Sequence, residues 1–121
     1  MPLTVTPRVE NDIAILELEG SLTLGPTLHN LRDAAKDALN DGKLSGLIVQ
    51  VSKVTATDSA GLGELTVVYT FAARRGARVA LAGASQALRT MLEVTHLDAL
   101  LPVAADVSAA KKLLAKARSE P

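Results

Sequence analysis

The run Leu47-Ile48-Val49-Gln50-Val51 is the stretch that most constrains the fold of this chain. It is almost continuously apolar, which is typical of a central strand that is covered on both faces or lies in a parallel sheet. Small, flexible and polar residues gather just after it, at Thr57-Asp58-Ser59-Ala60-Gly61-Leu62-Gly63-Glu64. Apolar residues at helical spacing follow. The sequence therefore predicts a buried strand, a tight junction and a helix in direct succession.

The rest of the chain alternates between strand-like and helix-like patterns. Two alternating segments, 3–9 and 13–19, flank the turn residues Asn11-Asp12 and predict an antiparallel hairpin. Pro7 lacks a backbone donor, so the first strand should lie at a sheet edge, and Gly20 should end the second strand. Further short strands are expected near 79–82 and 100–103. Helices are expected from Gly25-Pro26 to a stop at Asn40-Asp41-Gly42, then over 62–74, 85–97 and 107–117.

This order of elements predicts an α/β fold. Two strands are followed by alternating helices and strands, which implies a mixed, mostly parallel sheet of about five strands with about four helices and right-handed crossovers. With 121 residues, 48% of them hydrophobic, the chain should form one domain over residues 1–121. The tail at about 117–121 is expected to fray.

Composition excludes several classes of protein. The 13 basic residues are balanced by 13 acidic ones, and aromatic residues make up 2%, so neither a phosphate-neutralising surface nor base-stacking platforms are expected. The absence of cysteine excludes disulfides and cysteine-based zinc sites. No run is long enough to span a membrane, and the first residues do not resemble a secretory signal. We expect a soluble cytoplasmic domain, as a monomer or weak homodimer, that binds no nucleic acid.

The junction at Asp58-Ser59 has a structural and a functional interpretation. Both side chains can accept hydrogen bonds from the free amides of a first helical turn, so helix capping is the simpler interpretation. Gly61 and Gly63 are poor helix formers in that same turn, and they leave the Ser59 hydroxyl open to approach. From these residues alone, a functional serine remains the less common alternative.

Enzymatic interpretations find little support. Gly61-Leu62-Gly63 lacks the third glycine of a dinucleotide fingerprint. The nucleophile elbow of serine hydrolases needs a glycine two residues before the serine, where this chain has Thr57. The two histidines, His29 and His96, have no supporting cluster of metal ligands. We therefore expect no catalytic residues, no metal and no cofactor.

The helix after the junction is unusually apolar. Glu64 is the only charged residue between Ala60 and Ala73, and Gly63, Val67 and Phe71 form a stripe at a spacing of four. This pattern fits a helix buried over a wide face, and it equally fits an apolar patch beside Ser59 for a partner protein.

The segment from Val51 to Leu65, with Asp58-Ser59-Ala60-Gly61-Leu62-Gly63 at its centre, resembles the signature of the STAS domain, a family named for sulfate transporters and anti-sigma-factor antagonists. Residues 75–83, 85–97 and 100–106 resemble the family's later strands and helices. The resemblance implies a bacterial partner-switching regulator of transcription. In that family the serine is phosphorylated by an anti-sigma factor that is also a serine kinase; the unphosphorylated antagonist binds it and frees the sigma factor, and a serine phosphatase resets the switch.

Carried onto this chain, the resemblance makes Ser59 the phosphoacceptor. Together with the apolar stripe along the following helix, it predicts a partner-binding surface made of Thr23, Asp58, Ser59, Ala60, Gly61, Gly63, Val67 and Phe71. Family antagonists usually carry an acidic residue in the loop after the second strand, where this chain has Thr23. This departure leaves open a non-phosphorylated STAS role, as a scaffold in a signalling complex or an accessory subunit of a lipid-transport system. Modification of Thr55 or Thr57 in addition to Ser59 is a separate open alternative.

Overall fold

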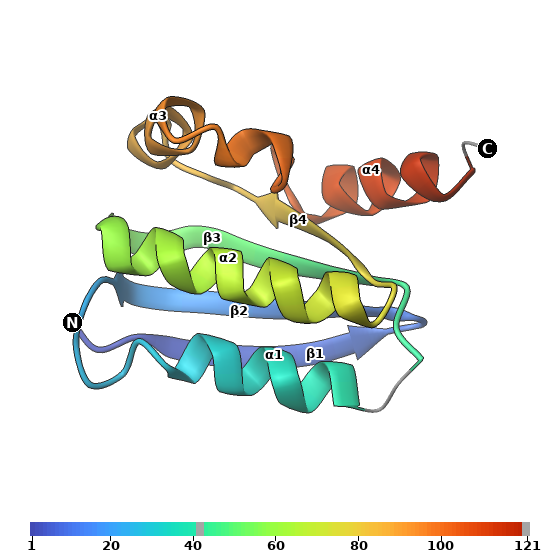
Figure 1. Ribbon diagram of the computed structural model, residues 1–121, viewed down its shortest axis with the longest axis horizontal. Coiled ribbons are helices and arrows are strands. Elements are labelled where there is room, and N and C mark those ends of the chain that lie inside the picture. The colour runs from blue at the N-terminus through green and yellow to red at the C-terminus, as the bar shows by residue number, and fades with distance from the viewer. Residues whose placement is uncertain (41–42, 120–121) are drawn as a thin grey trace.

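The computed structural model describes residues 1–40 and 43–119. The predicted helix stop at Asp41-Gly42 and the last two residues of the predicted frayed tail lie outside this part of the chain. Figure 1 shows the sheet and its helices. The strands are β1 (Thr4–Glu10), β2 (Ile13–Leu22), β3 (Gly46–Thr57), β4 (Arg78–Ala82) and β5 (Val103–Ala104). The helices are α1 (Asn30–Asn40), α2 (Ser59–Arg74), α3 (Gln86–Val94) and α4 (Val107–Ser119), with a 3-10 turn at Leu97–Ala99.

The strand order in the sheet is β1-β2-β3-β4-β5, the same as the order along the chain. β1 is antiparallel to β2, whereas the β2–β3, β3–β4 and β4–β5 pairs are parallel. The predicted α/β fold, a mixed and mostly parallel sheet with four helices, is therefore confirmed. Pro7 lies in β1 at the edge of the sheet, as its missing donor predicts.

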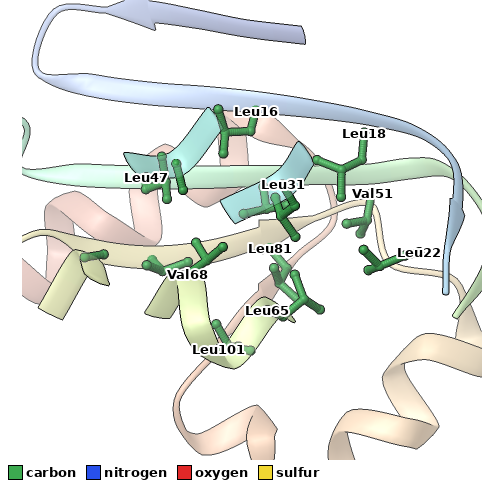
Figure 2. Close-up of a cluster of buried hydrophobic side chains, with 14 of the residues drawn as sticks. Leu16, Leu18, Leu22, Leu31, Leu47, Val51, Leu65, Val68, Leu81 and Leu101 are labelled. Atoms are coloured by element: carbon green, nitrogen blue, oxygen red, sulfur yellow. The ribbon is translucent and has the colours of Figure 1, made fainter. Parts of the chain in front are cut away.

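The larger core lies between one sheet face and helices α1, α2 and α3. Figure 2 shows leucines from strands β2, β3 and β4 meeting Leu31 of α1 and Leu65 of α2. A smaller core lies on the opposite face, where Ile15, Ile48 and Ala80 pack with Leu114 of α4. The run Leu47–Val49 is thus buried on both faces, which is why it contains no charged residue.

Helix α1 begins at Asn30, later than the Gly25-Pro26 start that the sequence predicts. The intervening residues are used to hold the first strand. The Thr27 hydroxyl accepts the Leu3 N–H at 2.8 Å, and the Asn30 side-chain amide donates to the Leu3 carbonyl at 3.1 Å. These contacts favour a turn over a regular first helical turn, so the proline signal was misleading here.

Two strands run past their predicted ends. β2 continues through Gly20 to Leu22, because Gly20 adopts a φ of +109° at an irregularity in the β2–β3 register and so does not end the strand. β3 continues from Val51 to Thr57 beside this extension, with Leu22 paired to Thr57. The extension brings β2 and β3 directly to the junction that contains Ser59.

The predicted strand over 100–103 was placed too early. The Leu100 and Leu101 N–H groups donate to the Leu97 carbonyl at 3.0 and 2.9 Å, which forms a 3-10 turn instead. The strand itself is only Val103–Ala104.

Candidate functional site

The candidate site lies at the carboxyl ends of β2 and β3. Figure 1 shows the loop after β2 and the start of α2 at the same end of the molecule. The Asp58 N–H donates to the Leu22 carbonyl at 3.4 Å, which joins the two segments where β3 passes into α2. Ligand and partner sites in open α/β sheets are commonly found outside the carboxyl ends of the strands.

Asp58 organises this junction. It is the N-cap of α2, and its Oδ1 accepts the Gly61 N–H at 2.9 Å. Its Oδ2 accepts the Leu24 N–H at 3.0 Å, which fixes the loop after β2 to the helix. The Leu24 amide, followed by the Gly61 amide, lowers the pKa of Asp58 because both stabilise the ionised carboxylate. The capping interpretation is therefore confirmed for Asp58.

Ser59 is the first residue of α2, and its side chain is exposed. Because Asp58 caps the helix, the Ser59 hydroxyl is not needed for that purpose. The hydroxyl thus stands at the positive end of a 16-residue helix, in a position that solvent or a second protein can reach.

The two glycines of the first turns have different surroundings. Gly61 is buried, and a Cβ atom at this position would lie 1.9 Å from the Leu22 carbonyl oxygen, so α2 can approach β2 only through a glycine. Gly63 is exposed, and a Cβ there would meet nothing within 4 Å. The fold therefore requires Gly61, but packing within the chain does not require Gly63.

Glu64, the lone charged residue of the apolar stretch, is buried against Arg32 of α1. Arg32 Nε donates to Glu64 Oε2 at 3.0 Å, and Arg32 Nη2 contacts the other carboxylate oxygen. The Glu64 carboxylate raises the pKa of the Arg32 guanidinium. The sequence analysis did not pair Arg32 with Glu64, although an isolated glutamate in an apolar helix is a signal that a partner is needed.

The predicted stripe Gly63, Val67 and Phe71 changes in exposure along α2. Val67 and Phe71 are half-buried, and Lys36 of α1 lies 4.8 Å from the centre of the Phe71 ring. This cation–π contact partly covers the ring. The interpretation as a helix buried over a wide face is confirmed for Leu62, Leu65, Val68 and Ala72, whereas the patch for a partner protein stays a prediction.

The loop after β2 contributes two neighbouring side chains. Thr23, at the position where an acidic residue was expected, is half-buried. Leu24 is 80% exposed, although its backbone is fixed by Asp58. Sequence reasoning did not single out Leu24, because a leucine in a loop gives no pattern from which its exposure can be deduced.

The remaining candidates lie as follows. Ala60 is half-buried in the first turn of α2, Thr55 is exposed on β3, and Thr57 is half-buried at its end. His29 and His96 are both exposed, and the described residues contain no group of three side chains suited to hold a metal ion. None of the helices in the described part of the chain combines the length and the apolar character needed to cross a membrane.

The comparison that decides the family is the match of residues 6–102 to the family model described as "Mlab, STAS domain". The chain belongs to the STAS family. The match begins within β1 and covers β2, the Asp58-Ser59 junction and helices α1 to α3.

Solved STAS structures share the fold at low sequence identity. An anti-sigma factor antagonist from Mycobacterium paratuberculosis is 18% identical over 93% of this chain and 93% of its own, with a TM-score of 0.78. Unphosphorylated SpoIIAA, an anti-sigma factor antagonist, is 14% identical over 98% and 99%, with a TM-score of 0.70, and its phosphorylated form from Bacillus also matches. A sulfate transporter family protein from Wolinella succinogenes is 21% identical over 90% and 92%, with a TM-score of 0.70.

Proposed function

We propose that this STAS domain is a cytoplasmic anti-sigma-factor antagonist that regulates transcription by partner switching. It binds an anti-sigma factor with serine kinase activity, and phosphorylation of Ser59 ends that binding until a phosphatase removes the group. The observation that carries the proposal is that Asp58, and not Ser59, caps the first turn of α2. Asp58 performs the capping, and Ser59 is left exposed on the adjacent position. The existence of SpoIIAA in phosphorylated and unphosphorylated forms supports the same switch.

Electrostatics explains how a phosphate at Ser59 would act. A phosphoserine carries about −1.5 to −2 charges at pH 7. The free amides at the start of α2 can stabilise this charge in the isolated domain. A partner packed against Ser59 would instead have to remove water from the phosphate, next to the ionised Asp58 carboxylate. Since about 1.4 kcal/mol corresponds to a tenfold change in affinity, a penalty of a few kcal/mol is enough to release the partner.

The proposed partner-binding surface consists of the predicted residues, some of which would contact the partner directly while others hold the backbone in place. Ser59, Ala60 and Gly63 offer surface for direct contact, and Val67 and Phe71 extend it along α2. Asp58 and Gly61 act through the backbone, because one fixes the Thr23-Leu24 loop and the other allows the close approach of α2 to β2.

Binding of purified kinase-type anti-sigma factors from the same organism tests this function. Ser59→Ala should bind as the wild type does, whereas Ser59→Asp should weaken binding by at least about 100-fold, in line with a few kcal/mol of lost affinity. Ser108→Asp is the matched control, since it makes the same change at an exposed position in the first turn of α4, on the opposite face of the sheet. Mass spectrometry after incubation with the kinase and ATP should find the phosphate on Ser59. Equal binding by Ser59→Asp and the wild type would exclude the switch.

A second candidate function is a STAS subunit that does not switch, either a scaffold in a signalling complex or an accessory subunit of a lipid-transport system. It is favoured by the uncharged Thr23 at the expected acidic position and by the similarity to a sulfate transporter family protein. In this case Ser59 substitutions have no effect on assembly, while Val67→Asp or Phe71→Ala breaks the complex. Co-purification of the complex with each variant distinguishes the two functions.

A further inference from the structure

The sheet is incomplete along one side of β4. Strand β5 is two residues long and pairs only with Leu81 and Ala82 of β4. The chain just before β5 forms the 3-10 turn instead of a longer strand. Among the described residues, no strand therefore lies beside the first half of β4, Arg78 to Ala80, on the β5 side.

A cavity of about 590 Å³ lies along this uncovered part of β4. Four segments enclose it: the last turns of α2, the start of β4, the chain around the 3-10 turn, and α4. Its volume is within the range of about 300–1,000 Å³ that is typical of small-molecule sites. Figure 1 shows the end of α2 and the start of β4 at the opposite end of the molecule from the start of α2. The cavity is thus separate from the site at Ser59. Its lining includes Tyr69, Arg78, Val79, Leu100, Pro102 and Leu113.

The backbone of Val79 offers the cavity a hydrogen-bond donor. The Arg78 N–H donates to the Ser45 carbonyl at 3.0 Å on the β3 side, whereas the Leu81 N–H donates to the Pro102 carbonyl at 2.8 Å on the β5 side. Because backbone groups alternate along a strand, the Val79 N–H points to the β5 side, where the described residues provide no acceptor for it. Val79 is 4% exposed, and backbone donors at such buried residues are normally hydrogen-bonded. An acceptor atom inside the cavity would complete this position.

The charges that line the cavity are of one sign. Arg78 is exposed and has no ion pair or side-chain hydrogen bond within the described part of the chain. A second hollow, of about 370 Å³, shares Leu113 with the cavity and is lined by Lys112. None of the described residues that line either hollow is acidic. The carbonyls of Ala72 and Ala73 at the end of α2 already accept backbone N–H groups. An anion is therefore the complement of this lining.

Apolar side chains form the rest of the lining. Leu100 and Leu113 are 40% and 37% exposed, although both are large hydrophobic residues. The second hollow continues past Leu113 with Val103, Ala104 and Ala109. A ligand with an elongated apolar body can cover these surfaces, whereas an inorganic anion would leave them in water.

We propose that this cavity binds a small amphiphilic anion, a carboxylate on an aliphatic chain. The Arg78 guanidinium and the Val79 N–H bind the carboxylate, since arginine and backbone amides both form strong hydrogen bonds to ionised oxygens. The aliphatic chain packs on Leu100 and Leu113. This binding site is additional to the proposed function and does not depend on a protein partner.

Two-dimensional NMR of the intact domain, titrated with decanoate at constant ionic strength, tests the proposal. Saturable shifts are expected at the amides of Val79, Leu100 and Leu113, with little change at Ser59. Decanol and decylamine carry the same chain with a neutral or a positive head. Each should bind at least about tenfold more weakly than decanoate, because neither provides charged acceptor oxygens for Arg78 and Val79.

Substitutions of the lining give the second part of the test. Arg78→Gln keeps most of the side-chain length and should weaken decanoate binding by about tenfold or more, since it removes the charge-assisted hydrogen bonds. Leu113→Ser should weaken it by roughly fivefold or more, because it removes apolar contact with the chain. Arg89→Gln is the matched control, since Arg89 is an exposed arginine on α3 that lines neither hollow. Unchanged amide spectra outside the substituted position establish that each variant is folded.

Several results would overturn the proposal. These are the absence of saturable shifts with decanoate, equal binding of decanol or decylamine, or equal losses with Arg78→Gln and Arg89→Gln. Sedimentation equilibrium without ligand distinguishes a second copy of the chain as the occupant. A dimer that forms with rising concentration and shifts the same three amides would assign the cavity to an interface between copies instead.

Discussion

At the scale of single residues, the start of α2 combines residues that the fold needs with residues that it does not. Asp58 accepts hydrogen bonds from the Leu24 and Gly61 amides, and Gly61 leaves no room for a side chain beside the Leu22 carbonyl. Ser59 and Gly63 are exposed. Substitutions at these positions should therefore affect stability and binding in different proportions.

Gly61→Ala should destabilise the domain, because its Cβ would lie 1.9 Å from the Leu22 carbonyl oxygen and force α2 away from β2. The expected loss is about 1–3 kcal/mol, as for other overpacked core positions. Gly63→Ala, which meets no atom within 4 Å, should instead gain about 0.5–1 kcal/mol. Urea denaturation of both variants measures the contrast. Similar effects on stability would contradict the different roles assigned to the two glycines.

The lowered pKa of Asp58 links the junction to pH. A carboxyl group whose pKa is lower in the folded state contributes stability above its unfolded value of about 3.9, and that contribution disappears as pH falls through the folded pKa. Stability should therefore fall more steeply on acidification in the wild type than in Asp58→Asn. Thermal melts of the two proteins between pH 6 and about pH 2.5 measure the difference, and parallel profiles would argue against it.

The residues of the site differed in how far the sequence could predict them. Ser59, Asp58 and the two glycines were found because they are neighbours in one short motif, where capping and turn preferences act locally. The Leu24–Asp58 and Arg32–Glu64 contacts were not found, since each joins residues more than 30 positions apart. Local patterns cannot indicate which distant side chains will meet.

At the scale of elements, the two sheet faces are covered unequally. Helices α1, α2 and α3 pack on the larger core, whereas the smaller core is closed by α4. Helix α4 packs closely on β3 at Gly46. A side chain at this position would place its Cβ only 2.8 Å from Leu114 Cδ1. The sequence patterns predicted which elements exist, but they did not predict where α1 begins or where β2 ends. Those boundaries depend on tertiary contacts at Thr27, Asn30 and Gly20.

Leu114→Ala should remove much of the attachment of α4 to the sheet. Leu114 is 3% exposed, and truncation of a buried leucine commonly costs about 2–5 kcal/mol. Leu113, its neighbour on α4, is 37% exposed, so Leu113→Ala should cost much less and serves as the matched control. Chemical denaturation followed by circular dichroism gives both values. Comparable losses in the two variants would mean that α4 is not held through Leu114.

At the scale of the whole molecule, the proposed switch requires no rearrangement of the sheet or helices. Ser59 is exposed, so a negative charge can be added without displacing a packed side chain. Chemical-shift changes caused by Ser59→Asp should therefore be confined to the 22–25 loop and the first two turns of α2. Two-dimensional NMR of the isolated domain measures this. Large changes in β4 or α4 would instead point to a conformational switch.

The strand order β1-β2-β3-β4-β5 also bears on how the chain acquires its structure. Each new strand adds beside the strand that precedes it in the sequence, so no strand has to insert between two that are already paired. Each parallel strand is joined to the next by a crossover that contains a helix, over residues 23–45, 58–77 and 83–102, so no strand has to wait for a partner from a later part of the chain. Assembly can then proceed from the N-terminus while the ribosome is still adding residues. In that order of events, β3 pairs with the hairpin before α2 leaves the ribosome. Ser59, the first residue of α2, would then reach its position beside three strands that are already paired.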